Sequence, residues 1–184
     1  MRRLVAVGTM NGVPIYVHWT LLTGVGLLLL GSLGSLANAA ASAVAIVAYF
    51  SAMLLHEWGH VVLARRRGCQ VFGIQLYPLV GLTKFQHPHT RLDHCVIAWG
   101  GVLFQTAVGL PMLVWIVAVG YSRLEVLNAF MAMFAYLTVI MVPVNLAPVA
   151  PLDGAIAWSI IPIFLRRLKG KKVPAGASRW NGLG

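Results

Sequence analysis

The stretch YFSAMLLHEWGHVVLARRRG, from Tyr49 to Gly68, combines an apolar helix with residues that a lipid bilayer excludes. Its sequence is mostly hydrophobic, and three arginines lie at its end. His56, Glu57 and His60 lie within the hydrophobic part, before these arginines. A charged side chain at the centre of a membrane helix costs about 3 kcal/mol or more, and such residues generally mark functional sites. The stretch therefore predicts a transmembrane helix that carries a chemical site.

The composition of the whole chain is that of an integral membrane protein. Of its 184 residues, 59% are hydrophobic and 10% are charged. This is too apolar for a soluble domain, and the length is sufficient for about four membrane spans. We expect no cleavable signal peptide, because the first apolar run begins late and no small-residue cleavage site closes it.

We therefore expect an all-α polytopic membrane protein with about four transmembrane helices and a short C-terminal helix. The uncharged runs place these helices near 17–36, 39–66, 94–120, 124–146 and 155–165. A small membrane-associated β-hairpin is expected at 71–85, where glycines and a proline interrupt strand-favouring residues. Residues 1–168 are predicted to form a single core, and the basic tail 169–184 is predicted to be disordered.

Basic residues are distributed asymmetrically along the chain, which has a formal net charge of +10. All of the 14 lysines and arginines except Arg123 precede the first predicted span, lie between the second and third, or follow the last. The positive-inside rule then places both termini in the cytoplasm, facing the lipid bilayer's anionic surface. No nucleic-acid partner is expected, because no recognition motif accompanies the charge. Cys69 and Cys95 are expected to be reduced thiols.

His-Glu-Trp-Gly-His, residues 56–60, matches the pattern H-E-x-x-H. On a helix, His56 and His60 project from one face and can bind the same metal ion. Neutral imidazoles suit zinc, which lowers the pKa of a bound water to about 7. Glu57 can then act as a general base toward that water. The alternative is that these three side chains only form hydrogen bonds within the helix bundle.

A zinc hydrolase needs a third protein ligand, and this chain has few acidic residues to supply it. They are Glu57, Asp93, Glu125 and Asp153. Asp93 and Glu125 lie at predicted helix ends, where such charges are common. Asp153 lies within VNLAPVAPLDG, whose prolines interrupt the helix, and irregular backbone within a membrane requires protein or a wet cavity around it. Asp153 is therefore the best candidate for the third ligand.

The HEWGH motif and the later segment NLAPVAPLDG together resemble the site-2 protease family of intramembrane zinc metalloproteases. The second family motif, Asn-x-x-Pro-x-x-x-Leu-Asp-Gly, is matched at 145–154. The stretch 12–22, GVPIYVHWTLL, is similar to the family's entry into its first helix. The stretch 64–85 is similar to its membrane-associated β-hairpin. These segments cover most of residues 8–160 in the family's order.

The resemblance implies roles for individual residues. His56, His60 and Asp153 would bind one zinc ion, and Glu57 would be the catalytic acid and base. Asn145 would form a hydrogen bond to the substrate carbonyl or its oxyanion. The implied reaction is hydrolysis of a peptide bond within or near the membrane, in regulated intramembrane proteolysis.

In the third helix the family usually carries Gly-Pro-x-x-Asn, whereas this chain has Gly-Val-Leu-Phe-Gln at 101–105. Gln105 could still donate an amide hydrogen bond, but its side chain is longer than that of Asn. The alternative for Gly100 and Gly101 is close packing between helices. The sequence leaves the role of Gln105 open.

The implied substrate is a single-span membrane protein or a signal-peptide-like remnant, cut in a prokaryotic cell (inner) membrane. An extended substrate could pair with the edge of the hairpin at 71–85; the alternative is an ordinary cytoplasmic loop. The chain is either a core without later gating helices or one gated by a homo-oligomer or a partner. Two other functions remain: a catalytically silent zinc-binding relative that sequesters clients, and a small metal transporter.

Overall fold

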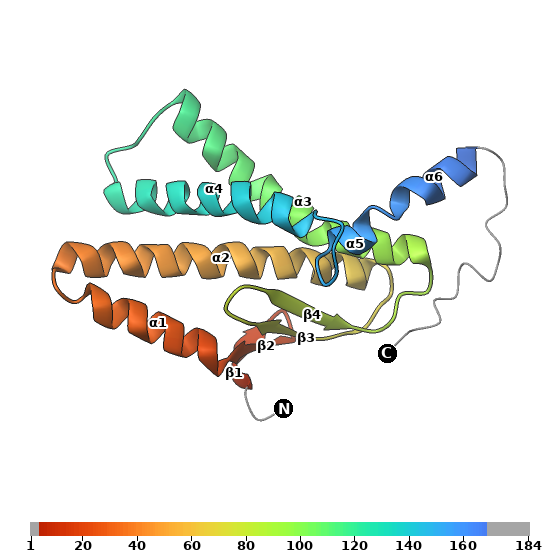
Figure 1. The fold of residues 1–184 in the computed structure, drawn as a ribbon, viewed down its shortest axis with the longest axis horizontal. Helices are drawn as coiled ribbons and strands as arrows, with labels where there is room; N and C mark the ends of the chain where they lie inside the picture. Colours follow the sequence, from red (N-terminus) through yellow and green to blue (C-terminus); the bar gives the residue numbers. More distant parts are fainter. Residues whose placement is uncertain (1–3, 169–184) are drawn as a thin grey trace.

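The computed structural model describes residues 4–168, with side chains through 165, and consists mostly of helices beside one small sheet (Figure 1). The predicted tail 169–184 lies outside the described residues. The strands are β1 (Leu4–Met10), β2 (Val13–His18), β3 (Val71–Leu76) and β4 (Gly81–Phe85). The helices are α1 (Trp19–Ser32), α2 (Leu36–Arg66), α3 (Arg91–Ala118), α4 (Glu125–Asn145), α5 (Gly154–Ala157) and α6 (Ile160–Leu168).

Three of the described helices, α2, α3 and α4, are long and apolar enough to cross a membrane. They correspond to three of the predicted spans. The first predicted span, 17–36, is shorter than expected, since α1 has 14 residues. At 1.5 Å per residue such a helix is about 21 Å long, against a hydrocarbon core of about 30 Å. Four spans therefore stay a prediction, whereas three membrane-capable helices are observed.

The sheet has four strands in the order β1-β2-β3-β4. The predicted hairpin is present as the antiparallel pair β3–β4, and β2 joins it in parallel with β3. The description of the chain as all-α is incomplete, because residues 4–18 form a second hairpin rather than only an entry to the first helix. Its turn is Asn11-Gly12, with φ of 47° and 79°. An Asn-Gly pair with positive φ at both residues is a strong hairpin signal.

The sheet packs against the C-terminal half of α2, as Figure 1 shows. A buried cluster joins the two, with Val17 of β2 and Ile74 of β3 near Met53 and Val61 of α2. The sheet thus holds β4 close to the part of α2 that carries the HEWGH motif.

Helix α3 makes its closest approach to α2 where Gly59 faces Gly100. A Cβ atom on either glycine would overlap the other residue's backbone, reaching 2.6 Å from the Gly59 carbonyl oxygen in the case of Gly100. Small residues allow helix backbones to pack closely in membranes. This confirms the packing role considered for Gly100. The close approach also places the neighbouring turns of α3 against the two histidines.

Candidate metal centre

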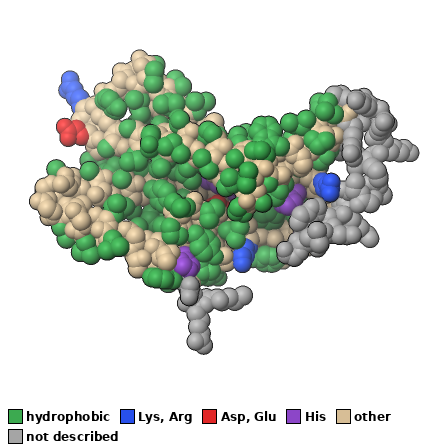
Figure 2. Space-filling view, viewed as in Figure 1, with side chains coloured by type: hydrophobic (Ala, Val, Ile, Leu, Met, Phe, Trp, Pro, Cys, Tyr) green, Lys and Arg blue, Asp and Glu red, His purple; other side chains and the backbone are tan. Residues whose placement is uncertain are grey.

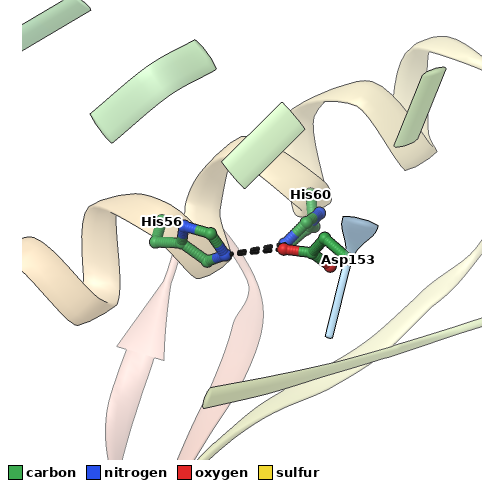
Figure 3. A group of neighbouring side chains, drawn as sticks. All are labelled: His56, His60 and Asp153. Atoms are coloured by element: carbon green, nitrogen blue, oxygen red, sulfur yellow. Dashed lines mark hydrogen bonds and ion pairs between the residues drawn. The ribbon is translucent and has the colours of Figure 1, made fainter. Parts of the chain in front are cut away.

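Two imidazoles and one carboxylate converge at the C-terminal half of α2 (Figure 3). His56 Nε2 lies 2.9 Å from Asp153 Oδ2, and His60 Nε2 lies 3.3 Å from the same oxygen. The two Nε2 atoms are 3.2 Å apart. Asp153 is separated from His56 by 97 positions in the sequence. It is brought back because α4 ends at Asn145 and the proline-containing turns after it fold toward α2.

The far side of each imidazole is held by α3. His60 Nδ1 lies 2.8 Å from the backbone oxygen of Ile97, and His56 Nδ1 lies 3.1 Å from Gln105 Oε1. Since both partners are oxygen acceptors, each Nδ1 carries a proton and donates it. In a neutral imidazole this leaves Nε2 with a free lone pair. Both Nε2 atoms therefore present electron pairs to the point where the Asp153 oxygen also lies.

Three converging lone-pair donors require a positive charge between them, either a proton on one imidazole or a metal ion. Asp153 would bind a metal in its ionised, carboxylate form. Within the described part of the chain, this is the one group of His, Cys, Asp and Glu arranged to hold a metal.

The residues present fit zinc. Two imidazole nitrogens and a carboxylate oxygen are the donor set of catalytic zinc sites, and ligand atoms around tetrahedral zinc with bonds of about 2.0–2.1 Å lie about 3.3 Å apart. The three observed separations, 2.9, 3.2 and 3.3 Å, are close to this value. Space beside them is kept open by Gly101, where a Cβ would lie 2.5 Å from His56 Nε2 and 2.6 Å from His60 Nε2.

Glu57 points toward the sheet, where its carboxylate contacts residues of β4. Thr83 Oγ1 donates to Glu57 Oε2 at 2.6 Å and lies 3.1 Å from the Glu57 backbone oxygen. A Cβ on Gly81 would overlap Glu57 Oε1. Gly81 and Thr83 alternate with exposed residues, so both face α2. The strand thus leaves room for the carboxylate and donates a hydrogen bond to it.

These groups line one cavity of about 960 Å³. His56, Glu57, His60 and Asp153 contribute to its wall, and so does Asn145 at the end of α4. All of β4 lines it as well, together with apolar residues of α4. Figure 2 shows a hydrophobic face with histidine and acidic atoms visible in a hollow near its centre. All five predicted site residues therefore line the same cavity.

Comparison with curated proteins finds similarity to zinc metalloproteases. The chain is 28% identical to "Putative zinc metalloprotease Rip3" of Mycobacterium tuberculosis, over 92% of this chain, in both the Erdman and H37Rv strains. It spans 38% of the length of these relatives. No protein-family profile matches the chain.

Comparison with solved structures identifies the fold. The site-2 protease from Methanocaldococcus jannaschii matches with a TM-score of 0.62 and 21% identity, over 89% of this chain and 72% of the other. The two similarities support one assignment. The chain has a site-2 protease fold and is similar in sequence to zinc metalloproteases, which supports the resemblance to the site-2 protease family. Together with these similarities, the three long apolar helices of the described residues support an integral membrane protein.

Within this site-2 protease fold, three contributors to the site were not predicted. Thr83 holds Glu57, Gly101 leaves space at the imidazoles, and Ile97 supplies a backbone acceptor to His60. Gln105, whose role the sequence left open, lies fully buried beside His56. A polar residue in an apolar helix is itself a signal of function. The acceptor at Ile97 is a backbone oxygen, which every residue has, so the residue type in the sequence gives no sign of it.

Proposed function

We propose that this chain is the core of a zinc-dependent endopeptidase that hydrolyses peptide bonds of transmembrane substrates within or near the membrane. The observation that carries the proposal is the convergence of His56, His60 and Asp153 in a cavity that Glu57 also lines. Two ligands from one helix and a third from a distant turn are the pattern of a catalytic zinc site, which keeps a further position for solvent. Residues 1–168 would form this core.

One zinc ion, when bound by His56, His60 and Asp153, would supply Lewis acidity and lower the pKa of water in the cavity. Glu57 is the proposed general base. Its carboxylate is buried and held by Thr83, so its orientation is set before substrate arrives. It would take the proton from the attacking water and pass it to the leaving nitrogen. The Asn145 amide is proposed to donate a hydrogen bond to the developing oxyanion.

The edge of β4 is the proposed site for the substrate backbone. β4 is the last strand of the sheet, so one side of it has no strand partner among the described residues, and it lines the cavity. A peptide in a transmembrane helix is protected by its own hydrogen bonds and must unwind before cleavage. Pairing with an exposed strand edge would give the unwound segment new backbone hydrogen bonds in place of those of the helix. The expected substrate is a single-span membrane protein or a signal-peptide-like remnant.

The arrangement of helices supports a cytoplasmic position for the sheet. β2 pairs with β3, so the chain returns to the same end of the molecule after α1 and α2. Arg65, Arg66 and Arg67 lie at this end of α2, whereas Arg123 lies in the connection between α3 and α4. By the positive-inside rule, both termini would be cytoplasmic in a prokaryotic cell (inner) membrane. Access to the cavity would be gated by a partner or by a second copy of the chain.

A silent zinc-binding relative is less well supported, because the proposed base and oxyanion donor line the same cavity as the ligands. The decisive experiment uses the full chain purified in detergent, with a single-span substrate. Cleavage that stops with a zinc chelator and returns with zinc supports the proposal. Zinc binding without cleavage of any membrane substrate would support the silent relative, and transport of zinc into vesicles with the peptide intact would support a transporter.

A further inference from the structure

One face of α3 serves both histidines of the metal centre. Ile97, Gly101 and Gln105 are spaced four residues apart, which places them on one face of the helix. Ile97 accepts a hydrogen bond from His60, Gly101 borders both Nε2 atoms, and Gln105 accepts a hydrogen bond from His56. Of the two acceptors, only that of Gln105 is a side-chain atom. It is therefore the one that a substitution can remove.

Gln105 is fully buried between the helices. Burying an amide without hydrogen bonds costs about 1–3 kcal/mol, so each end of the amide needs a partner. The oxygen lies 3.1 Å from His56 Nδ1, and the nitrogen donates to the Met141 sulfur of α4 at 3.7 Å. The thioether can only accept, and so it directs the amide nitrogen toward α4 and the oxygen toward His56.

We propose that Gln105 is a positioning residue that orients His56 for the metal and increases the affinity of the site for zinc. Its oxygen keeps the proton of the neutral ring on Nδ1, so that Nε2 faces the metal. The same contact prevents rotation of the ring about its bond to Cβ. This inference rests on the proposed function only for the identity of the metal. The alternative is that Gln105 fills space between α2, α3 and α4.

The test is a zinc affinity, measured on the purified full chain by competition with a chromophoric chelator. Gln105→Met has nearly the same size and no comparable oxygen acceptor, whereas Gln105→Glu keeps an oxygen at that position. Loss of an outer partner of a metal-binding histidine lowers metal affinity about 10- to 100-fold. We expect that loss for Gln105→Met and affinity within a few-fold of wild type for Gln105→Glu. Thermal unfolding of the apo forms reports whether each variant is folded.

Thr106→Val is the matched control, because Thr106 is the next residue of α3 and its buried hydroxyl has no hydrogen-bond partner in the described structure. It should bind zinc like wild type. If Gln105→Met does not fold, Gln105→Asn replaces it, since the shorter side chain should also lose the contact and the affinity. Wild-type affinity in a folded Gln105→Met or Gln105→Asn chain, or equal losses in Gln105→Met and Gln105→Glu, would overturn the proposal.

The measurement separates this inference from the proposed function. A wild-type chain that binds zinc but cleaves no membrane substrate would refute the protease, while the affinities would still decide the role of Gln105. Cleavage by the wild-type chain, together with equal zinc affinities in wild type and a folded Gln105→Met variant, would refute the role of Gln105 alone. A wild-type chain without zinc affinity would overturn both.

Discussion

Helices α2 and α3 contribute to the same centre in different ways. α2 supplies His56, Glu57 and His60, whose chemistry is apparent from their spacing. α3 supplies a backbone oxygen, an absent side chain and one amide, at Ile97, Gly101 and Gln105. The first set has the chemistry to bind and react, whereas the second contacts the imidazoles and leaves space beside them. Reactive residues can therefore be found from their types, but supporting residues become visible only from their contacts.

The largest expected effect is in α2. Glu57→Gln should lower cleavage about 10²- to 10⁴-fold, the usual contribution of a general acid or base. The zinc content should remain that of wild type, because Glu57 is not among the three converging ligands. Cleavage rate and metal content should be measured on the same preparation. Wild-type cleavage by this variant would show that Glu57 is not the base.

The next effect is in α3, from Gly101→Ala. The added Cβ would lie 2.5 Å from His56 Nε2, so the ring must move or the helices must separate. Overpacking costs about 1–3 kcal/mol, equivalent to roughly a 5- to 150-fold loss of zinc affinity. The chelator competition assay measures it.

Gly109→Ala is the matched control for that substitution. It lies on the same helix, and its Cβ would overlap Thr138 of α4, away from the imidazoles. It should destabilise the fold without changing zinc affinity. Equal zinc affinities in the Gly101 and Gly109 variants would show that α3 does not shape the metal site.

A smaller effect, on kcat, is expected from a substitution in β4 of the sheet. Thr83→Val removes the donor to Glu57 and keeps the side-chain shape. A hydrogen bond to a charged group contributes about 1.5–3 kcal/mol, so kcat should fall about tenfold or more. KM and zinc content should change little, and Thr83→Ser should restore kcat. A change in KM alone would indicate a role in substrate binding instead.

The smallest effect is expected at the end of α2, outside the site. Arg67 Nη1 lies 3.1 Å from Asp93 Oδ1, and the Arg67 side chain is 39% exposed. Exposed ion pairs contribute about 0–1 kcal/mol. Arg67→Gln should therefore change the free energy of unfolding by less than about 1 kcal/mol, with zinc affinity unchanged. A larger loss in chemical denaturation would show that this pair supports the bundle.

Much of the fold could be predicted because its signals are local. The long apolar runs predicted α2, α3 and α4, and the broken strand-like segment predicted β3 and β4. The hairpin at 4–18 was missed because its apolar residues merge with those of α1, although Asn11-Gly12 signals a turn. The same merging made the first helix too long in the prediction.

The proximity of the three candidate metal ligands could be predicted because their side chains belong to motifs, whereas their roles stay predictions. His56, His60 and Asp153 do converge, as their residue types indicated. The support of Glu57 by Thr83 could not be predicted, because it depends on where β4 packs against α2 and Thr is common in strands. The role of Gln105 required the register between α2 and α3, which the contact of Gly59 with Gly100 determines.

The most direct test of the central claim is the zinc stoichiometry and affinity of the purified chain beside those of Asp153→Ala. The structure places one carboxylate oxygen within 3.3 Å of both imidazoles. We predict about one tightly bound zinc ion per wild-type chain and at least a roughly tenfold weaker affinity in the variant. Equal zinc binding by a folded Asp153→Ala chain would contradict a metal centre shared between α2 and the turn after α4.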